Sequence, residues 1–361
     1  MRTTLENLVK IPLYKSFRSC GFPKMLPMNY TLLISTMCNS RCKTCNIWKQ
    51  RHNDLKIDEW KKVFKSIGTS PFWVTVSGGE PFLQKHLADM VISLDRICKP
   101  SIVNIPTNSL FPDNVKNQVI KILKNTKIPR LIVNLSLDGK GKEHDRIRGI
   151  PGNFEKVMQN YKNLKKIQED YPNFTIGFHS VISNFNIGSI KELIDFAFEL
   201  EPDQYLTEIA ENRVELDTVG LPITPSYQNY SRIVDYLIMK MDKYSYKKFG
   251  RFTKAFRMEY YQFVKNWLKK KKLLPDFAGF ASCEIASWGE VWPSCIKGEN
   301  LGNLRKVNYD FNKVWFSKKA NDIRKEIKEK GTSYPLANAF YSSSFNHIPT
   351  LLKVLKNIIT N

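Results

Sequence analysis

Between residues 30 and 210, short and nearly continuous apolar runs alternate with longer amphipathic segments. Apolar runs of this length are typical of buried parallel strands, and apolar residues at helical spacing indicate helices that pack on such a sheet. Strands are predicted at 30–35, 72–77, 102–107, 131–137, 175–182 and 205–209, and helices at 57–67, 84–97, 112–124, 153–169 and 187–200. Six strand–helix repeats predict an α/β fold, a partial (β/α)6 TIM-like barrel that carries its functional groups at the carboxyl ends of the strands.

The alternation stops after residue 210. Residues 211–275 predict a helical segment with two long helices, 227–246 and 251–274. Residues 276–361 predict a smaller α+β extension, which contains a hairpin between Cys283 and Cys295 and ends in an amphipathic helix at 348–359. Residues 1–29 form a basic, amphipathic segment that we expect to pack on the domain surface rather than on a membrane.

Composition narrows the class of protein. With 361 residues and 42% hydrophobic content the chain can bury a large core. No stretch approaches the roughly 20 apolar residues of a membrane span, and the first 22 residues lack the apolar run of a signal peptide. The cysteines are grouped rather than scattered, which agrees with a reducing compartment. The expected location is the cytoplasm, with a peripheral position at the membrane as the second option.

The charge is strongly positive, with 56 Lys and Arg against 34 Asp and Glu, a net charge of +22. Such a field attracts anions, so an acidic substrate, nucleic acid and an anionic membrane surface are all open as partners. Lysine enrichment of a surface by an AT-rich genome is an equally good explanation.

Three of the seven cysteines, Cys38, Cys42 and Cys45, follow the first predicted strand at Cys-x3-Cys-x2-Cys spacing. Soft thiolates on one short loop suit an iron–sulfur cluster or zinc. A zinc site needs a fourth ligand, and His52 could supply it, although a solvated surface histidine is the better interpretation of its polar surroundings. A cubane cluster held by three thiolates instead keeps one iron open for a ligand.

Polar residues also follow the next three strands. Gly78 and Gly79 can let the backbone approach a ligand, and Glu80 can accept hydrogen bonds from an ammonium group. Arg148 can form a bidentate pair with a carboxylate. By themselves the Gly-Gly-Glu-Pro and Asp138-Gly139 segments are equally typical of turns, and His144 is expected to be a solvated surface histidine.

The cysteine loop together with Gly78-Gly79-Glu80-Pro81 resembles the radical S-adenosylmethionine (SAM, AdoMet) superfamily. The resemblance implies that Cys38, Cys42 and Cys45 hold a [4Fe-4S] cluster whose open iron binds AdoMet. It further implies that AdoMet is bound by Gly78, Gly79, Glu80, Asn108, Ser136 and Arg148. It assigns no side chain a catalytic role. One departure is Thr44, where many relatives have an aromatic residue near the adenine, and Ile47 or Trp48 is the expected replacement.

The Cys283–Cys295 segment is similar to the start of the SPASM or twitch extensions, which bind auxiliary clusters. No cysteine follows Cys295, and two thiolates cannot hold a typical four-thiolate cluster, so a second cluster is not expected. The preferred interpretation is a degenerate extension kept for packing, in which residues 331–344 take the place of the missing cysteine segment. A cluster completed by His347 and free redox thiols are the alternatives.

The resemblance implies an iron–sulfur enzyme of the oxidoreductase or transferase type that cleaves AdoMet reductively to a 5′-deoxyadenosyl radical, which then abstracts hydrogen from a substrate. It would need a reductase or a flavodoxin- or ferredoxin-type electron donor. The run from Ser136 to Arg148 and the extension favour a peptide or protein substrate. The basic surface and amphipathic termini favour, as an alternative, a phosphorylated lipid or glycan precursor at a membrane surface. A non-catalytic protein that binds AdoMet or a cluster is the alternative from another class.

Overall fold

The computed structural model describes residues 4–246, 248–271, 273–330 and 334–360. Within these residues the centre of the protein is a nine-stranded sheet with the order β6-β5-β4-β3-β2-β1-β7-β8-β9. Its strands are β1 (Asn29–Leu33), β2 (Trp73–Ser77), β3 (Ile102–Thr107), β4 (Arg130–Ser136), β5 (Phe174–Ile182), β6 (Gln204–Ile209), β7 (Ser282–Ile285), β8 (Glu290–Trp292) and β9 (Gly302–Asn303). The first six strands are parallel neighbours, which confirms the predicted partial barrel.

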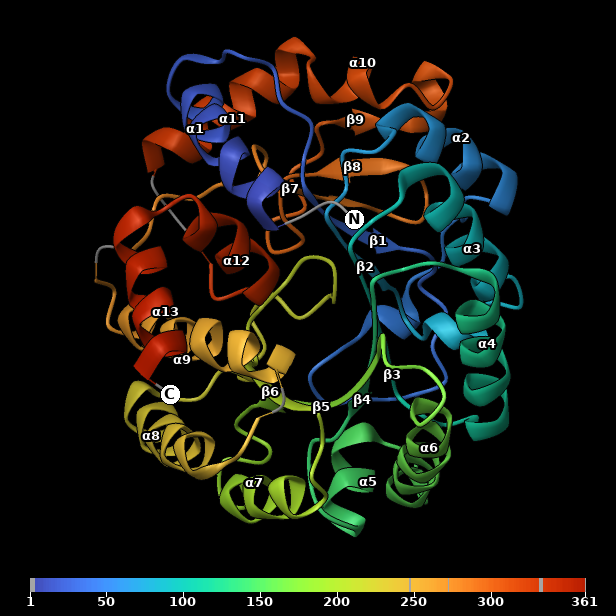
Figure 1. Ribbon diagram of the computed structural model, residues 1–361, viewed down its shortest axis with the longest axis vertical. Helices are drawn as coiled ribbons and strands as arrows, with labels where there is room; N and C mark the ends of the chain where they lie inside the picture. The colour runs from blue at the N-terminus through green and yellow to red at the C-terminus, as the bar shows by residue number, and fades with distance from the viewer. Residues whose placement is uncertain (1–3, 247, 272, 331–333, 361) are drawn as a thin grey trace.

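Helices of the strand–helix repeats cover the outer side of the curved sheet, and a second group lies at its edges and across its open side (Figure 1). Those of the repeats are α2 (Ile57–Ile67), α3 (Leu87–Cys98), α4 (Pro112–Asn125), α5 (Lys142–Arg148), α6 (Asn153–Gln168) and α7 (Ile190–Glu199). All but α5 were predicted within three residues at each end. The second group comprises α1 (Thr4–Cys20), α8 (Tyr227–Lys243), α9 (Lys248–Leu268), α10 (Phe311–Trp315), α11 (Lys318–Lys330), α12 (Ala337–Phe345) and α13 (Ile348–Thr360). Among the described residues no helix is long and apolar enough to cross a membrane.

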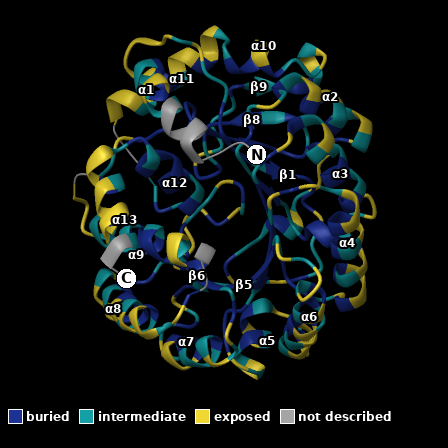
Figure 2. Ribbon diagram, in the orientation of Figure 1, coloured by how far each residue is buried: buried dark blue, intermediate teal, exposed yellow. Residues whose placement is uncertain are grey.

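The core lies between the sheet and the inner faces of these helices (Figure 2). In α2 the residues Trp60, Val63, Phe64 and Ile67 are all buried, and they pack against Tyr30 and Val74 of the sheet in one continuous cluster. Helical spacing gathers them on one stripe, which explains why this helix was predicted at its observed bounds.

The C-terminal extension continues the sheet of the barrel. Strand β7 pairs in parallel with β1, from Asn29 opposite Ser282 to Leu32 opposite Ile285. Strands β8 and β9 then add in antiparallel order, so the predicted hairpin at 283–295 is present. The domain boundaries predicted at 210 and 275 stay predictions, and the structure adds that the sheet is continuous across them.

The first helix packs on the extension, as predicted. Tyr14 and Phe17 of α1 are 2% and 4% exposed and form a small apolar cluster with Phe277 and Phe280. Arg18 donates a hydrogen bond from Nε to the carbonyl oxygen of Asp276 at 2.8 Å. The predicted replacement segment at 331–344 falls partly on residues 331–333, which lie outside the described residues, and its remainder forms most of α12.

Candidate functional site

The cysteine loop, residues 38–45, leaves the carboxyl end of β1 and lies against the Gly-Gly-Glu-Pro turn after β2. Gly79 N donates to Ser35 O at 2.7 Å, and Glu80 N donates to Met37 O at 2.8 Å. A Cβ atom on Gly79 would stand 2.2 Å from Met37 O, and one on Gly78 would stand 2.6 Å from Ser35 O. The glycines therefore allow two backbones to touch. The close approach was predicted from the sequence, but in the structure its partner is the base of the cysteine loop.

The opposite side of the loop rests on the carboxyl end of α5. Arg41 N donates to Arg148 O at 3.0 Å, and Lys43 N donates to Ile147 O at 2.9 Å. Gly149 ends the helix at φ +71°, and a Cβ there would stand 2.4 Å from Arg41 O. Helix α5 was missed from the sequence, because seven residues behind a glycine turn are too short to show a periodic pattern. The loop is thus held between the β2 turn and α5.

The three thiols of the loop are free and largely shielded from solvent. Burial raises the pKa of Cys38 to about 11, and it also raises the pKa values of Cys42 and Cys45. Since metals bind thiolates, a metal on this loop must displace the thiol protons. Ile47, one of the two expected replacements for an aromatic residue, is 2% exposed and packs in one cluster with Cys38 and Cys45.

Glu80 and Asn108 form a hydrogen-bond network that supports the cysteine loop. The Glu80 carboxylate accepts hydrogen bonds from Thr107 Oγ1 at 2.8 Å, Phe82 N at 3.1 Å and Asn108 N at 2.6 Å. Burial raises the pKa of Glu80 to about 7, although these hydrogen bonds oppose the rise. Asn108 Nδ2 donates to Asn39 Oδ1 at 2.8 Å and lies 3.8 Å from Cys38 Sγ. A carboxylate offers about four acceptor sites, so Glu80 keeps one for a ligand.

Arg148 and Ser136 retain unused polar atoms beside the thiols. Arg148 Nη1 forms an ion pair with Asp138 Oδ2 at 3.0 Å, whereas its buried Nε has no hydrogen-bond partner among the described residues. The carbonyl oxygen of Arg148 accepts from the backbone N of Arg41, the residue before Cys42, so Arg148 lies beside the cysteine loop. The half-buried Ser136 hydroxyl, at the end of β4, likewise has no partner in the described part of the chain. Both groups can bind a polar ligand.

His144 is buried, so the expectation of a solvated surface histidine is wrong. Its exposed fraction is 0%, its Nδ1 accepts a hydrogen bond from Asp138 N at 3.1 Å, and its Nε2 lies 3.3 Å from Asn153 Oδ1. Burial lowers the pKa of His144 to about 4. The neutral ring therefore ties the turn after β4 to the start of α6. His52, by contrast, is exposed as expected and stacks on Trp288 with ring centroids 3.7 Å apart.

A cavity of about 420 Å³ occupies the interior of the barrel. Its apolar wall comes from α9, α12 and α13, and includes Phe256, Phe345 and Val354. Its polar wall contains His179, Glu208, Arg213, Glu215, Glu284 and Cys295. The segment that follows β6 links this wall to the cysteine loop, because Asn46 N donates to Leu216 O at 2.8 Å. Sequence reasoning missed this polar wall, although the acidic run from Glu208 to Glu215 follows the sixth strand and could have signalled it.

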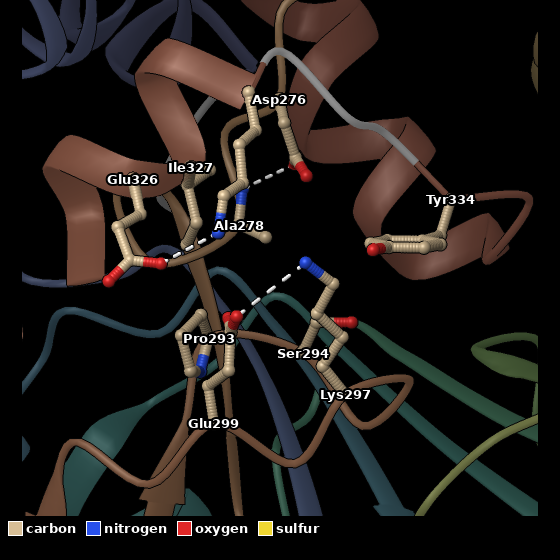
Figure 3. Close-up of a pocket in the computed structure, with 10 residues that line it drawn as sticks. Asp276, Ala278, Pro293, Ser294, Lys297, Glu299, Glu326, Ile327 and Tyr334 are labelled. Carbon is tan, nitrogen blue, oxygen red and sulfur yellow. Dashed lines mark hydrogen bonds and ion pairs between the residues drawn. The ribbon is translucent and has the colours of Figure 1, made fainter.

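A second hollow lies in the extension (Figure 3) and is far smaller, at about 10 Å³. Its charged groups already have partners within the protein. Lys297 lies 3.6 Å from Glu299, and Asp276 accepts a hydrogen bond from Ala278 N at 2.8 Å. A volume of this size holds about one water molecule, so this hollow is no substrate site.

Cys283 and Cys295 face different sides of the sheet. Cys283 lies opposite Tyr30 in the register and belongs to the same apolar cluster. Glu284, the next residue of β7, points to the other face and lies beside Cys295 in the cavity wall. His347 is half-buried on the terminal helices, where its Nδ1 lies 2.9 Å from Thr350 Oγ1. The hairpin thus does not bring its two thiols together on one face.

These observations define a partial-barrel protein with a half-buried three-thiol loop and polar groups at the carboxyl ends of its strands. Residues 32–197 match the family model of the radical SAM superfamily. Residues 32–197 thus form a radical SAM domain, and a [4Fe-4S] cluster and S-adenosylmethionine are the cofactors of that superfamily.

Relatives and solved structures agree with this assignment. The chain is 26% identical over 164 residues to the sporulation killing factor maturation protein SkfB of Bacillus subtilis, and 28% identical over 190 residues to a GTP 3′,8-cyclase of Clostridium perfringens. These matches cover 45% and 49% of this chain but 38% and 53% of the relatives, so the chain spans about half or less of their length.

The fold is similar to that of Streptococcus suis SuiB bound to S-adenosylmethionine, with a TM-score of 0.61, 17% identity, and coverage of 89% of this chain and 72% of SuiB. It is also similar to anSMEcpe bound to AdoMet and a peptide, with a TM-score of 0.62, 13% identity, and coverage of 93% and 97%.

The residues of this chain fit the cofactors of the superfamily. Three half-buried thiols on one loop could supply the soft ligands of the cluster, and the buried Nε of Arg148, which has no partner among the described residues, supplies a donor that an anionic ligand would satisfy. Cys38, Cys42 and Cys45 would hold the cluster, and Arg148, Ser136 and Glu80 would contact AdoMet.

Proposed function

We propose that this protein is a radical SAM enzyme that modifies a peptide or protein substrate in the barrel cavity. The observation that carries the proposal is the structural connection between the cysteine loop and the cavity. The loop is braced by the β2 turn and α5, and the Asn46–Leu216 hydrogen bond connects it to the segment that carries the polar cavity wall.

The bound cluster and AdoMet would supply a one-electron cleavage of the sulfonium, which yields a 5′-deoxyadenosyl radical. The chain itself binds and orients. Arg148 would hold the AdoMet carboxylate with the donors that Asp138 leaves free, Glu80 would accept from the amino group, and Ser136 would contact the ribose. The apolar wall of the cavity excludes water from the radical.

A peptide substrate is supported by the kinds of proteins that this chain is similar to. SkfB is a maturation protein, SuiB has been solved with its precursor peptide SuiA, and anSMEcpe has been solved with bound peptides. The cavity supports the same class, since its mixed apolar and charged walls can receive both the side chains and the polar backbone of a peptide segment.

The test is AdoMet cleavage by the anaerobically reconstituted protein with dithionite, measured as 5′-deoxyadenosine by chromatography. We expect product from the wild type and none from Cys42→Ala. Addition of a random-sequence peptide pool should raise the rate and leave a mass change on a subset of peptides. AdoMet binding without any 5′-deoxyadenosine would instead establish the non-catalytic binding protein.

One observation favours the second candidate, a phosphorylated lipid or glycan precursor. Helix α13 presents Ile348, Leu352 and Leu355 at 54%, 60% and 45% exposure, next to the exposed Lys353. An apolar stripe flanked by cations suits an anionic membrane surface. Cosedimentation with phosphatidylglycerol vesicles that is lost in Leu352→Asp, together with vesicle-stimulated AdoMet cleavage, would favour this candidate over the peptide.

A further inference from the structure

Three side chains with metal-binding atoms meet in the polar wall of the barrel cavity. They are Glu215 from the segment after β6, Glu284 from β7, and Cys295 from the loop after β8. One ligand atom from each lies within 4.8 Å of the other two. The residues are 7%, 3% and 3% exposed, so all three groups are buried far from bulk solvent.

One of these groups has an unsatisfied atom. Glu284 Oε1 has no hydrogen-bond partner among the described residues, although buried carboxylate oxygens are almost always paired. The next carboxylate, Glu215, carries the same charge and so does not compensate it. The site therefore lacks a positive partner.

The surrounding charged side chains do not provide Glu284 with a positive partner. Glu208, Glu211 and Glu215 all pair with Arg213, and Glu208 also lies 3.8 Å from Arg257 and 3.5 Å from His179. Arg213 lies 2.9 Å from Glu211 and 3.8 Å from Glu215, and in the described part of the chain no cationic side chain lies within 4 Å of Glu284. Among the described residues Glu284 therefore has no cationic partner of its own, and a bound metal ion would supply one.

The chemistry of the donors selects the cation. A thiolate with two carboxylates suits zinc or ferrous iron, whereas calcium and magnesium prefer oxygen ligands alone. We propose that Glu215, Glu284 and Cys295 bind one zinc-class or ferrous ion, with the remaining coordination position open to the barrel cavity. The site is separate from the cysteine loop and does not depend on the proposed function. Cys283, on the other face of β7, takes no part in it.

The test uses the full-length Cys38→Ala/Cys42→Ala/Cys45→Ala variant, which lacks the loop thiols, titrated anaerobically with Co2+. We expect one Co2+ per chain with a thiolate-to-cobalt charge-transfer band that Zn2+ abolishes by displacement. In the same background Cys295→Ser should remove the band, and Glu284→Gln should weaken binding by more than about 100-fold. Cys283→Ser, the matched control, should bind Co2+ as the parent does.

The proposal is overturned if the parent variant binds no Co2+ stoichiometrically, or if Cys295→Ser leaves the band intact. A second pair of results would also overturn it: the wild type contains neither zinc nor iron beyond its cluster, and Glu284→Gln raises the urea midpoint of unfolding. Glu284 would then be a buried protonated acid rather than a metal ligand. Urea unfolding of every variant separates loss of the site from loss of the fold. Absence of AdoMet cleavage by the reconstituted wild type, together with intact Co2+ binding by the triple variant, would disprove the proposed function alone.

Discussion

Arg148 is a buried cation only partly used by the protein. One nitrogen pairs with Asp138, and Nε remains without a partner beside the thiols. A buried donor without a partner costs free energy that a ligand can recover, so we expect Arg148 to bind an anion.

Arg148→Lys tests this placement. Lysine keeps a positive charge near Asp138 but loses the forked guanidinium, so we expect the KM for AdoMet to rise about 10-fold or more, equivalent to ~1.4 kcal/mol. The measurement is 5′-deoxyadenosine formation against AdoMet concentration. Arg146→Lys, on the same helix with a half-exposed side chain, is the matched control and should leave the KM unchanged. An unchanged KM in Arg148→Lys would contradict the assignment.

His144 gives the protein a pH dependence of known sign. Its pKa is about 4 in the folded protein because it is buried, against about 6.5 when unfolded. Between these values only the unfolded chain binds the proton. The stability that the neutral, buried His144 contributes is therefore fully present above about pH 6.5. As the pH falls toward 4, the free energy of unfolding decreases by up to ~3 kcal/mol.

Urea unfolding from pH 7 to pH 4 checks this prediction. His144→Gln retains an acceptor for Asp138 N but cannot take up a proton, so its stability should fall less steeply with acid than that of the wild type. Parallel curves for the two proteins would refute a buried neutral histidine. The sequence could not reveal this role, because His144 sits among charged residues and its burial depends on α6, α5 and the β4 turn meeting in space.

At the scale of elements, the cysteine loop is held by its contacts with the β2 turn and with the carboxyl end of α5. Gly79→Ala would place a methyl group 2.2 Å from Met37 O, which is backbone and cannot move aside cheaply. We expect destabilisation of about 1–3 kcal/mol or more, together with lower iron content after reconstitution. Gly188→Ala, where nothing lies within 4 Å, is the control and should leave both quantities near those of the wild type. Equal iron loading in the two variants would show that the contact is dispensable.

Most elements of the barrel were predictable because their signal is local. Strand β3 is a continuous run whose observed bounds, Ile102–Thr107, match the prediction, and α2 shows a clear apolar stripe. Cys38, Cys42 and Cys45 were likewise visible as a spacing. Helix α5 and the polar cavity wall could not be predicted. The helix is a single short segment, and the wall brings together residues more than 80 positions apart in the sequence.

At the scale of the whole molecule, a charged contact fastens the extension to the barrel. Glu59 of α2 accepts from Arg305 Nε at 2.8 Å and Nη2 at 3.1 Å, and from Tyr309 Oη at 2.6 Å. Arg305 also donates to the carbonyl oxygens of Asn53 and Asp54 at 2.7 and 3.0 Å. The hydrogen bonds from Arg305 lower the pKa of Glu59 to about 2. This stabilisation is present above about pH 4.5 and is lost as the pH falls toward 2.

A double-mutant cycle with Glu59→Gln and Arg305→Gln measures the strength of this contact. We expect a coupling free energy of about 1.5–3 kcal/mol at pH 7, since the pair is bidentate and mostly buried. The pair of Glu326 and Lys330, each 56% exposed, is the matched control and should couple by about 0.5 kcal/mol or less. Equal coupling in the two cycles would mean that solvent screens the contact between barrel and extension.

The pairing of β1 with β7 has a consequence for the order of biosynthesis. The strand that leads into the cysteine loop has β2 on one side and residues 282–285 on the other, some 250 positions later in the chain. During translation one edge of β1 stays bare until most of the polypeptide has left the ribosome. The edge of β1 is therefore covered late in the synthesis of this protein, and chains that terminate before residue 282 would present this strand with an open edge beside the cysteine loop.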